Sequence, residues 1–128
     1  MKIWLTKNIS HNINIINTKY INFVKTNKFI EMDELIKNVK LWADEKNLLK
    51  KENSHAQMLK VLEEVGETAG ALLKKKEKEI IDGLGDSFVT LIILCYQLNL
   101  EPEDCLQAAW EEIKNRKGKT VNGTFIRE

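Results

Sequence analysis

The sequence SHAQMLKVLEEVGETAGALL at residues 54–73, together with EIIDGLGDSFVTLIILCYQL at residues 79–98, decides the fold. In the first stretch apolar residues recur at intervals of three and four, which predicts an amphipathic helix from Ser54, a suitable N-cap, to about Lys74. The second stretch is apolar on nearly every side from Phe88 onward, so it predicts a central helix or one that a partner subunit covers. The stripe that we expect the first helix to bury comprises Met58, Leu62, Val65, Ala69 and Leu72.

Two further helices are predicted on either side of this pair. One runs from Asp33, as its N-cap, to about Leu49, and the other begins at Pro102, which suits the first position of a helix. Their expected buried faces comprise Leu35, Ile36, Val39, Trp42 and Ala43 in one, and Cys105, Leu106, Ala109, Trp110 and Ile113 in the other. Asn122-Gly123 marks a turn in the tail. Four helices with short connections predict an all-α four-helix bundle, paired in a dimer or a higher oligomer.

The composition fits one domain with an unusual leader. The chain has 128 residues, one Pro and six Gly, which argues against an all-β fold. Residues 1–31 carry five Lys and one acid, so residues 32–128 hold 15 basic and 18 acidic residues. We interpret residues 1–31 as a basic, Asn- and Ile-rich leader, either mobile or translated from too early a start, before a helical domain at residues 32–128.

The cysteines and the apolar run bear on location. Cys95 and Cys105 sit among apolar residues, as small core residues of a reduced protein do, and a disulfide between them is the less favoured alternative. The run from Phe88 to Leu98 is about half of the ~20 residues needed to span a bilayer. No signal peptide is visible, so we expect a cytoplasmic protein that does not contact membranes.

Carboxylates cluster on both central helices. Glu63, Glu64 and Glu67 are three and four residues apart, and Asp82 and Asp86 are four apart, so each group shares one side of its helix. Like charges next to a core stripe repel and need a cation. If the helices pack antiparallel, both groups face one cavity and suit Mg²⁺ or Mn²⁺. The alternative for either group alone is a solvated acidic face.

Positively charged side chains offer contacts for a phosphorylated ligand. Lys60 shares the acidic stripe, where it can pair with Glu64 or with a phosphate. The other cationic side chains that are candidates to contact a phosphate group are Lys114, Arg116, Lys117 and Lys119. Their alternative role is to complement the dipole at a helix C-terminus.

The carboxylate pattern resembles a known family. Glu63-Glu64-x-x-Glu67 followed by Asp82-Gly-Leu-Gly-Asp86 is similar to the E-E-x-x-E and E-x-x-D pattern of the MazG-type all-α nucleoside triphosphate pyrophosphohydrolases, especially those of phages and low-GC bacteria. The resemblance covers about residues 32–128. It implies an oligomeric, Mg²⁺-dependent enzyme that splits a nucleoside triphosphate into the monophosphate and pyrophosphate and so cleans the nucleotide pool.

The resemblance also assigns roles to residues. Glu64, Glu67 and Asp86 match metal ligands, and Glu63 or Glu64 is the candidate to orient or deprotonate the attacking water. The second Glu of the family pattern is absent because Gly83 stands there, with Asp82 as the physically reasonable substitute. Trp42 matches an aromatic residue that stacks on the base in similar proteins, although a core Trp is the simpler interpretation.

Two other functions compete with hydrolysis. A helical dimer that kept the fold but lost catalysis would bind a nucleotide or a partner, and Gly83 is the best support for it. A nucleic-acid-associated protein would use the basic leader, but five Lys without ordered spacing are poor evidence. The sequence does not identify the nucleotide.

Overall fold

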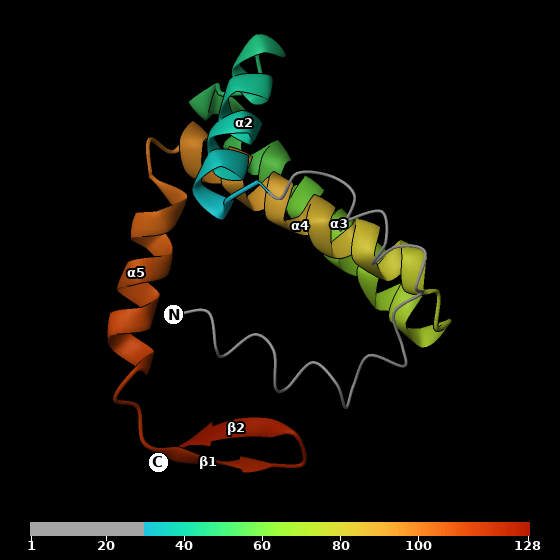
Figure 1. The fold of residues 1–128 in the computed structure, drawn as a ribbon, viewed down its shortest axis with the longest axis vertical. Coiled ribbons are helices and arrows are strands. Elements are labelled where there is room, and N and C mark those ends of the chain that lie inside the picture. Colours follow the sequence, from blue (N-terminus) through green and yellow to red (C-terminus); the bar gives the residue numbers. More distant parts are fainter. Residues whose placement is uncertain (1–29) are drawn as a thin grey trace.

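The computed structural model describes residues 30–128, and these residues form helices followed by a small hairpin (Figure 1). The elements are α2 (Met32–Glu45), the 3₁₀ turn η2 (Lys51–Asn53), α3 (Ser54–Leu73), α4 (Glu77–Gln97), α5 (Pro102–Ile113), β1 (Gly118–Val121) and β2 (Thr124–Arg127). The all-α prediction is confirmed. Nearly all of the predicted leader, residues 1–29, lies outside the described residues.

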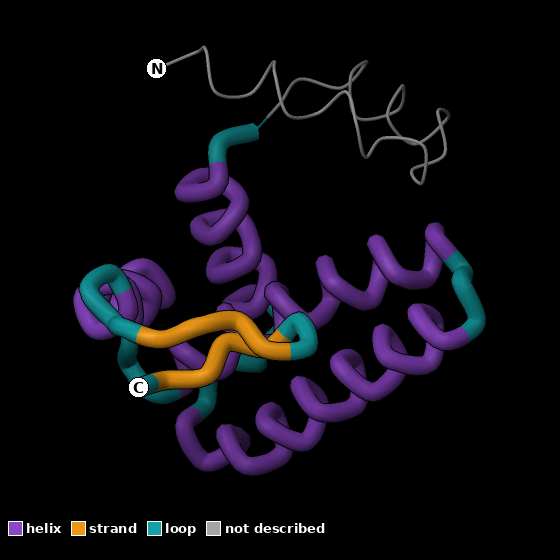
Figure 2. Tube along the Cα trace, turned by 90° about the horizontal axis from the view of Figure 1, so that it is seen from below, coloured by secondary structure: helices purple, strands orange, loops and turns teal. Residues whose placement is uncertain are grey.

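Helices α3 and α4 form an antiparallel pair that organises the fold (Figures 1 and 2). The chain reverses at Lys75, whose φ of 54° is left-handed, and the Lys76 N–H donates to the Ala71 carbonyl at 3.0 Å, which closes the end of α3. Gln57 Nε2 reaches across the pair and donates to the Thr90 carbonyl at 3.0 Å. The pair is therefore fixed in register at both ends.

The face of α3 that meets α4 is not the predicted apolar stripe. Val61, Glu64, Thr68 and Ala71 are buried there. The members of the predicted stripe are exposed, namely Met58, Leu62, Val65, Ala69 and Leu72. The prediction was wrong for the single chain because α4 covers only one side of α3.

Helix α2 packs near the C-terminal end of α4. Ile36 and Ala43 are buried, and Lys40 Nζ lies 4.3 Å from the centre of the Tyr96 ring. Burial, with a smaller contribution from the negative charge of Glu101, raises the pKa of Tyr96 to about 12. Gln97 Nε2 donates to the Leu48 carbonyl at 2.7 Å and holds the loop after α2.

Two helix starts differ from those predicted. The N-cap of α2 is Glu31, so Asp33 lies in the first turn. There its negative charge interacts favourably with the positive end of the helix dipole. The N-cap of α3 is Asn53, and Ser54 is the first helical residue because the 3₁₀ turn leads directly into α3.

Helix α5 projects from the other helices and buries none of its residues (Figure 1). Its predicted inner face is exposed, with Leu106 at 74% and Trp110 at 53%. Cys105 is also exposed, and Cys95 is half-buried. Of the two cysteines that were predicted to be core residues, only Cys95 is therefore even partly buried. Both thiols are free, and burial raises the pKa of the Cys95 thiol, with a further effect from neighbouring Cys105.

The tail forms an antiparallel hairpin, of which the sequence indicated only the turn. Asn122 and Gly123 have φ values of 49° and 76°, which suit the tight turn that joins two twisted strands. The register pairs Gly118 with Arg127. A Cβ at Gly118 would overlap the Phe125 ring, so the absent side chain leaves room for Phe125 to cover this end of the hairpin.

Candidate active site

The buried carboxylate of Glu64 is the centre of the candidate site. Glu64 is 8% exposed and lies on the side of α3 that faces α4. Lys60 Nζ lies 3.0 Å from Glu64 Oε1 and 3.0 Å from Glu63 Oε1. Both contacts raise the pKa of Lys60 above its ordinary value, and the hydrogen bond with Glu64 has the larger effect. An ammonium group thus occupies the position of a counter-ion for two of the carboxylates.

The neighbouring hydroxyls are bonded within their own helices. Thr68 Oγ1 donates to the Glu64 carbonyl at 2.8 Å, and Thr90 Oγ1 donates to the Asp86 carbonyl at 2.9 Å. Ser87 Oγ does the same to the Gly83 carbonyl at 2.7 Å. These bonds satisfy the hydroxyl donors, so the carboxylates are the groups left to act on a ligand.

The remaining predicted ligands, on α3 and α4, lie on exposed surface. Glu67, Asp82 and Asp86 are all exposed. Within residues 30–128, no group of three or more His, Cys, Asp or Glu side chains is arranged to hold a metal ion. The donors are all carboxylates, which fit a hard cation such as Mg²⁺ in their chemistry. A metal would have to draw Glu67 and Asp86 toward Glu64 and displace Lys60.

Gly83 is buried in the contact between the two helices. A Cβ built on it would overlap Thr68 Oγ1 and lie 3.2 Å from Thr68 Cβ and 3.3 Å from Thr68 Cα. The space that the Glu side chain of the related pattern would enter is therefore filled here by Thr68 of α3. Asp82, the predicted substitute, is exposed and interacts within the described chain.

Trp42 borders an apolar pocket of about 370 Å³ between α2 and α4. The lining residues are Leu35, Asn38, Val39, Trp42 and Val89. Trp42 is 48% exposed, which disagrees with its interpretation as a core residue. Val89 follows Asp86 by three residues of α4, so the pocket begins about one helical turn from that carboxylate.

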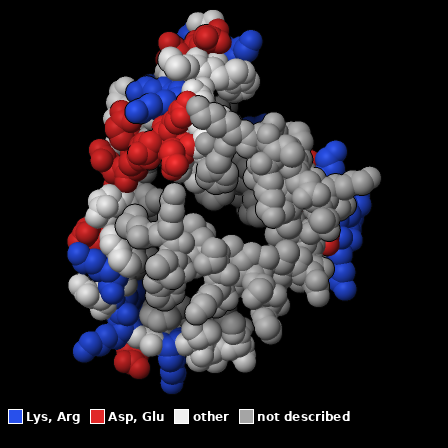
Figure 3. Space-filling view, viewed as in Figure 1, with Lys and Arg blue, Asp and Glu red and all other residues white. Residues whose placement is uncertain are grey.

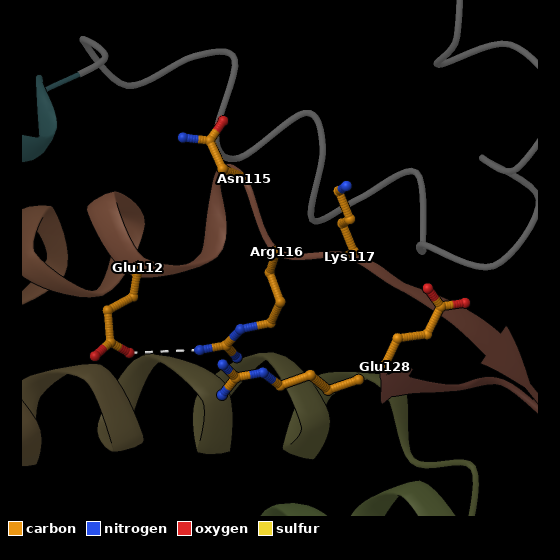
Figure 4. Close-up of a pocket in the computed structure, with 6 residues that line it drawn as sticks. Glu112, Asn115, Arg116, Lys117 and Glu128 are labelled. Carbon is orange, nitrogen blue, oxygen red and sulfur yellow. Dashed lines mark hydrogen bonds and ion pairs between the residues drawn. The ribbon is translucent and has the colours of Figure 1, made fainter.

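The basic candidates divide into two groups. Arg116 and Lys117 line a pocket of about 420 Å³ at the end of α5, whereas Lys114 and Lys119 do not (Figure 4). Lys114 instead forms an ion pair with Glu111. Arg127, at the end of β2, completes the pocket. The sequence prediction missed Arg127 because only strand pairing brings it beside residues that precede it by ten or more positions.

Charge is unevenly spread over the face drawn in Figure 3. Acidic side chains gather where α4 passes into α5, whose first turn contains Glu103 and Asp104. Lysine and arginine lie at the opposite end of α5 and on the hairpin. Within the described chain, no helix has the length and apolar character needed to cross a membrane.

Comparison with known proteins identifies the fold that carries these carboxylates. Residues 52–121 match the model of the MazG nucleotide pyrophosphohydrolase domain. The chain belongs to the MazG family. The match begins just before α3 and ends with β1, so it contains all five candidate carboxylates, Lys60, and the basic residues from Lys114 to Lys119.

A curated relative comes from a phage. It is described as an uncharacterized 18.2 kDa protein in the rep-hol intergenic region of Haemophilus phage HP1, and it is 35% identical over 71 residues. The alignment covers 56% of this chain and 44% of the relative, so the chain spans less than half of the relative's length. No solved structure matches. Membership of the MazG family implies nucleotide pyrophosphohydrolase activity in general.

The Lys60 contacts predict a measurable stability effect. Lys60→Met leaves the buried Glu64 carboxylate without this counter-ion, so we expect a lower Tm at pH 7. Because the pKa of Lys60 is higher in the folded chain than its ordinary 10.5, the stabilisation is present below pH 10.5 and declines as pH rises toward the folded value. The difference in Tm between wild type and variant should therefore narrow above pH 10.5.

A matched control separates burial from charge. Lys76 and Glu79 form an ion pair at the same three-residue spacing as Lys60 and Glu63, but both side chains are about half exposed. Lys76→Met should change the Tm much less, since exposed pairs contribute little. Equal losses of Tm in the two variants would show that the burial of Glu64 adds nothing to the Lys60 contact.

Proposed function

We propose that the chain is a Mg²⁺-dependent nucleoside triphosphate pyrophosphohydrolase. It converts an NTP or dNTP and water into the monophosphate and pyrophosphate, a cytoplasmic reaction that cleans the nucleotide pool. The observation that carries this proposal is the buried Glu64 carboxylate, held between two MazG helices with Glu63 and Lys60 beside it. A buried charge of this kind requires a cation; Lys60 supplies one in the single chain, and a metal would take its place in the active form.

Each residue has a proposed role in this reaction. Glu64, Glu67 and Asp86 would hold the metal, with Asp82 as a further ligand, and Mn²⁺ is an acceptable substitute for Mg²⁺. When bound, the metal neutralises phosphate charge. Glu63 or Glu64 orients or deprotonates the attacking water. These roles are consistent with one buried and several exposed carboxylates, because the exposed side chains of Glu67 and Asp86 can change rotamer toward a metal.

Substrate contacts follow from the two pockets and from Lys60. Trp42, half exposed beside an apolar pocket near Asp86, would stack on the base. Lys60 would exchange its contacts with Glu63 and Glu64 for a phosphate oxygen when a metal binds. The end of α5 offers Arg116 and Lys117, with Lys114 and Lys119 as weaker candidates outside the pocket.

The active form is proposed to be a homodimer or homotetramer. Helices α3, α4 and α5 all expose large apolar side chains, among them Leu62, Phe88 and Leu106. Within the described chain only the small residue Ala43 is completely buried, and no large hydrophobic side chain is fully enclosed. A second copy would cover these faces, because exposed apolar patches of this kind mark interaction surfaces. Light scattering after size exclusion would give the mass, and a monomer at micromolar concentration would contradict the proposal.

Two observations favour a second function. The carboxylates are not gathered around a metal position, and Gly83 replaces a family ligand within a tight helix contact. A nucleotide- or partner-binding module without catalysis fits both facts. It predicts weak Mg²⁺ affinity by calorimetry and little change in Tm when Mg²⁺ and a nucleotide are added together.

A nucleotide screen tests the leading proposal. The purified chain is incubated with canonical and modified NTPs and dNTPs, with and without Mg²⁺, and pyrophosphate is measured. We expect release from at least one nucleotide that depends on Mg²⁺. The absence of pyrophosphate from every nucleotide, with either Mg²⁺ or Mn²⁺, would reject an active enzyme and favour the binding module.

A further inference from the structure

The corner between α4 and α5 brings the two cysteines of the chain together. Residues 98–101 connect the helices, with Cys95 in the last turn of α4 and Cys105 as the fourth residue of α5 (Figure 1). The Leu100 N–H donates to the Cys95 carbonyl at 2.9 Å, so the connection folds back onto the end of α4. The Cys105 N–H donates to the Glu101 carbonyl at 3.2 Å, which places Cys105 one helical turn, about 5.4 Å, beyond the connection. The backbone therefore holds both cysteines at one corner.

The two thiols interact across this corner. Burial has the largest effect in raising the pKa of the Cys95 thiol, and Cys105 raises it further through its charge and through a hydrogen bond between the two side chains. Such a hydrogen bond requires the sulfur atoms to be neighbours. Both thiols are free, Cys105 is exposed and Cys95 is half-buried. A reagent in solution can therefore reach Cys105, and the Cys95 thiol lies beside it.

We propose that Cys95 and Cys105 are a reversible dithiol–disulfide couple that cross-links α4 to α5. The free thiols of this structure are its reduced form. In compartments that keep most thiols reduced, disulfides are usually transient and serve as redox sensors. A couple of this kind is therefore compatible with a protein whose cysteines are normally reduced.

The oxidant is a small-molecule disulfide such as oxidised glutathione. The Cys105 thiolate attacks one of its sulfur atoms, which forms a mixed disulfide and releases one glutathione thiolate. Cys95 then loses its proton and attacks Cys105 Sγ, which forms the protein disulfide and releases the second glutathione. The two protons from the cysteines pass to the two released thiolates. Two protein thiols are thus oxidised while one glutathione disulfide is reduced.

Exposure assigns the order of the two attacks. Cys105 meets the oxidant first because its side chain is exposed, whereas Cys95 is half-buried at the end of α4. The raised pKa of Cys95 keeps its thiol protonated, and a protonated thiol attacks an oxidant in solution slowly. Once the mixed disulfide has formed on Cys105, the neighbouring Cys95 thiol attacks within the same molecule.

The cross-link would act on an arm that has few contacts with the other helices. Helix α5 buries none of its residues, and both strands of the hairpin that follows it are exposed along their whole length. Figure 1 shows α5 projecting away from the α3 and α4 pair. Within the described chain the direction of the arm therefore depends on residues 98–101. A disulfide at this corner would fix the angle between α4 and α5, and it requires neither a metal nor the proposed hydrolysis.

A redox titration of the full chain tests the couple. The reduced protein is equilibrated in buffers with a rising ratio of oxidised to reduced glutathione, quenched with an alkylating reagent and weighed by intact mass spectrometry. The wild type should pass from two alkyl groups to none, with the loss of two hydrogens, and digestion should yield one peptide pair joined through Cys95 and Cys105. Cys95→Ser should stop at a mixed disulfide with one glutathione. Cys95→Ala repeats this arm if serine at the half-buried position lowers the Tm.

A matched control keeps two thiols but moves one of them out of reach. Ala109 is exposed on α5, one helical turn beyond Cys105. The double variant Cys105→Ser with Ala109→Cys should therefore take up glutathione without closing a disulfide to Cys95. A control that closes as readily as the wild type would show that the corner does not select the pair.

Two further measurements report on the cross-linked corner. Amide hydrogen exchange of the oxidised wild type should be at least about tenfold slower at the Leu100 and Cys105 N–H groups, since the disulfide joins the segments that carry them. The Tm should rise by at least about 5 °C and return to its reduced value after treatment with dithiothreitol. Unchanged exchange at both N–H groups would contradict a fixed angle between α4 and α5.

Three chemical results would overturn the couple. The wild type could resist oxidation, it could stop at a mixed disulfide with glutathione as Cys95→Ser does, or it could form a disulfide between two copies of the chain, which a non-reducing gel separates from the internal one. Failure of the nucleotide screen leaves the couple untouched, because the redox titration involves no turnover.

Discussion

Glu67→Gln is expected to lower kcat/KM for Mg²⁺-dependent pyrophosphate release by at least about a hundredfold. The change replaces one carboxylate oxygen by an amide and removes the negative charge, while the side chain keeps its size. Glu67 is exposed on α3, so the fold should tolerate the change within about 0.5 kcal/mol. A large loss of activity with an unchanged Tm would therefore indicate that Glu67 acts in metal binding and not in folding.

The measurement needs a metal titration and a matched control. Pyrophosphate release is followed over a range of Mg²⁺ concentrations, and a lost ligand should raise the Mg²⁺ concentration required for half-maximal rate. Glu45→Gln makes the same chemical change at an exposed position in the last turn of α2 and should keep wild-type kinetics. If Glu67→Gln also keeps wild-type kinetics, Glu67 is not a metal ligand and the assignment of the E-E-x-x-E pattern is wrong.

The helices could be predicted because their signals are local. Apolar spacing and Pro102 each act within a few residues, and α3, α4 and α5 begin or end within a few residues of the predicted positions. The carboxylate pattern is local as well, since it depends on spacing along one helix. This explains why the MazG resemblance could be stated from the sequence and was confirmed by the family match.

The arrangement of faces could not be predicted in the same way. Helix α3 has an apolar stripe through Leu62 and a mixed stripe through Glu64 and Thr68, and only packing decides which of them meets α4. The single chain buries the mixed stripe and exposes the apolar one. Arg127 was missed for a related reason, because its place beside Arg116 follows from strand pairing and not from any spacing in the sequence.

Gly83→Ala is expected to destabilise the chain by about 1–2 kcal/mol, although Ala usually favours a helix over Gly by about 1 kcal/mol. The new Cβ would overlap Thr68 Oγ1 and crowd the backbone of α3, with Thr68 Cα only 3.3 Å away. The helices would have to move apart along their buried face. Thermal unfolding should show a Tm lower by roughly 4–8 °C for each kcal/mol lost in a domain of this size.

Gly85 supplies a matched control two residues away in the same helix. A Cβ at Gly85 would meet no atom within 4 Å. Gly85→Ala should therefore raise the free energy of unfolding by up to about 1 kcal/mol, and the Tm should rise with it. Thr68→Ala in the Gly83→Ala background removes the overlapping oxygen and should recover part of the loss. If Gly83→Ala and Gly85→Ala raise the Tm equally, the close contact between α3 and α4 does not exist in solution.

The same contact predicts the outcome of restoring the family residue. Gly83→Glu adds both the overlapping Cβ and a charge at a buried position, so it should destabilise the chain more than Gly83→Ala does. We therefore expect it to lower pyrophosphate release, even though it recreates the E-x-x-D spacing with Asp86. A gain in activity or in Mg²⁺ affinity would instead show that α3 and α4 separate in the active form and that Gly83 is a lost ligand. The direction of this change distinguishes a glycine kept for helix packing from one that marks lapsed catalysis.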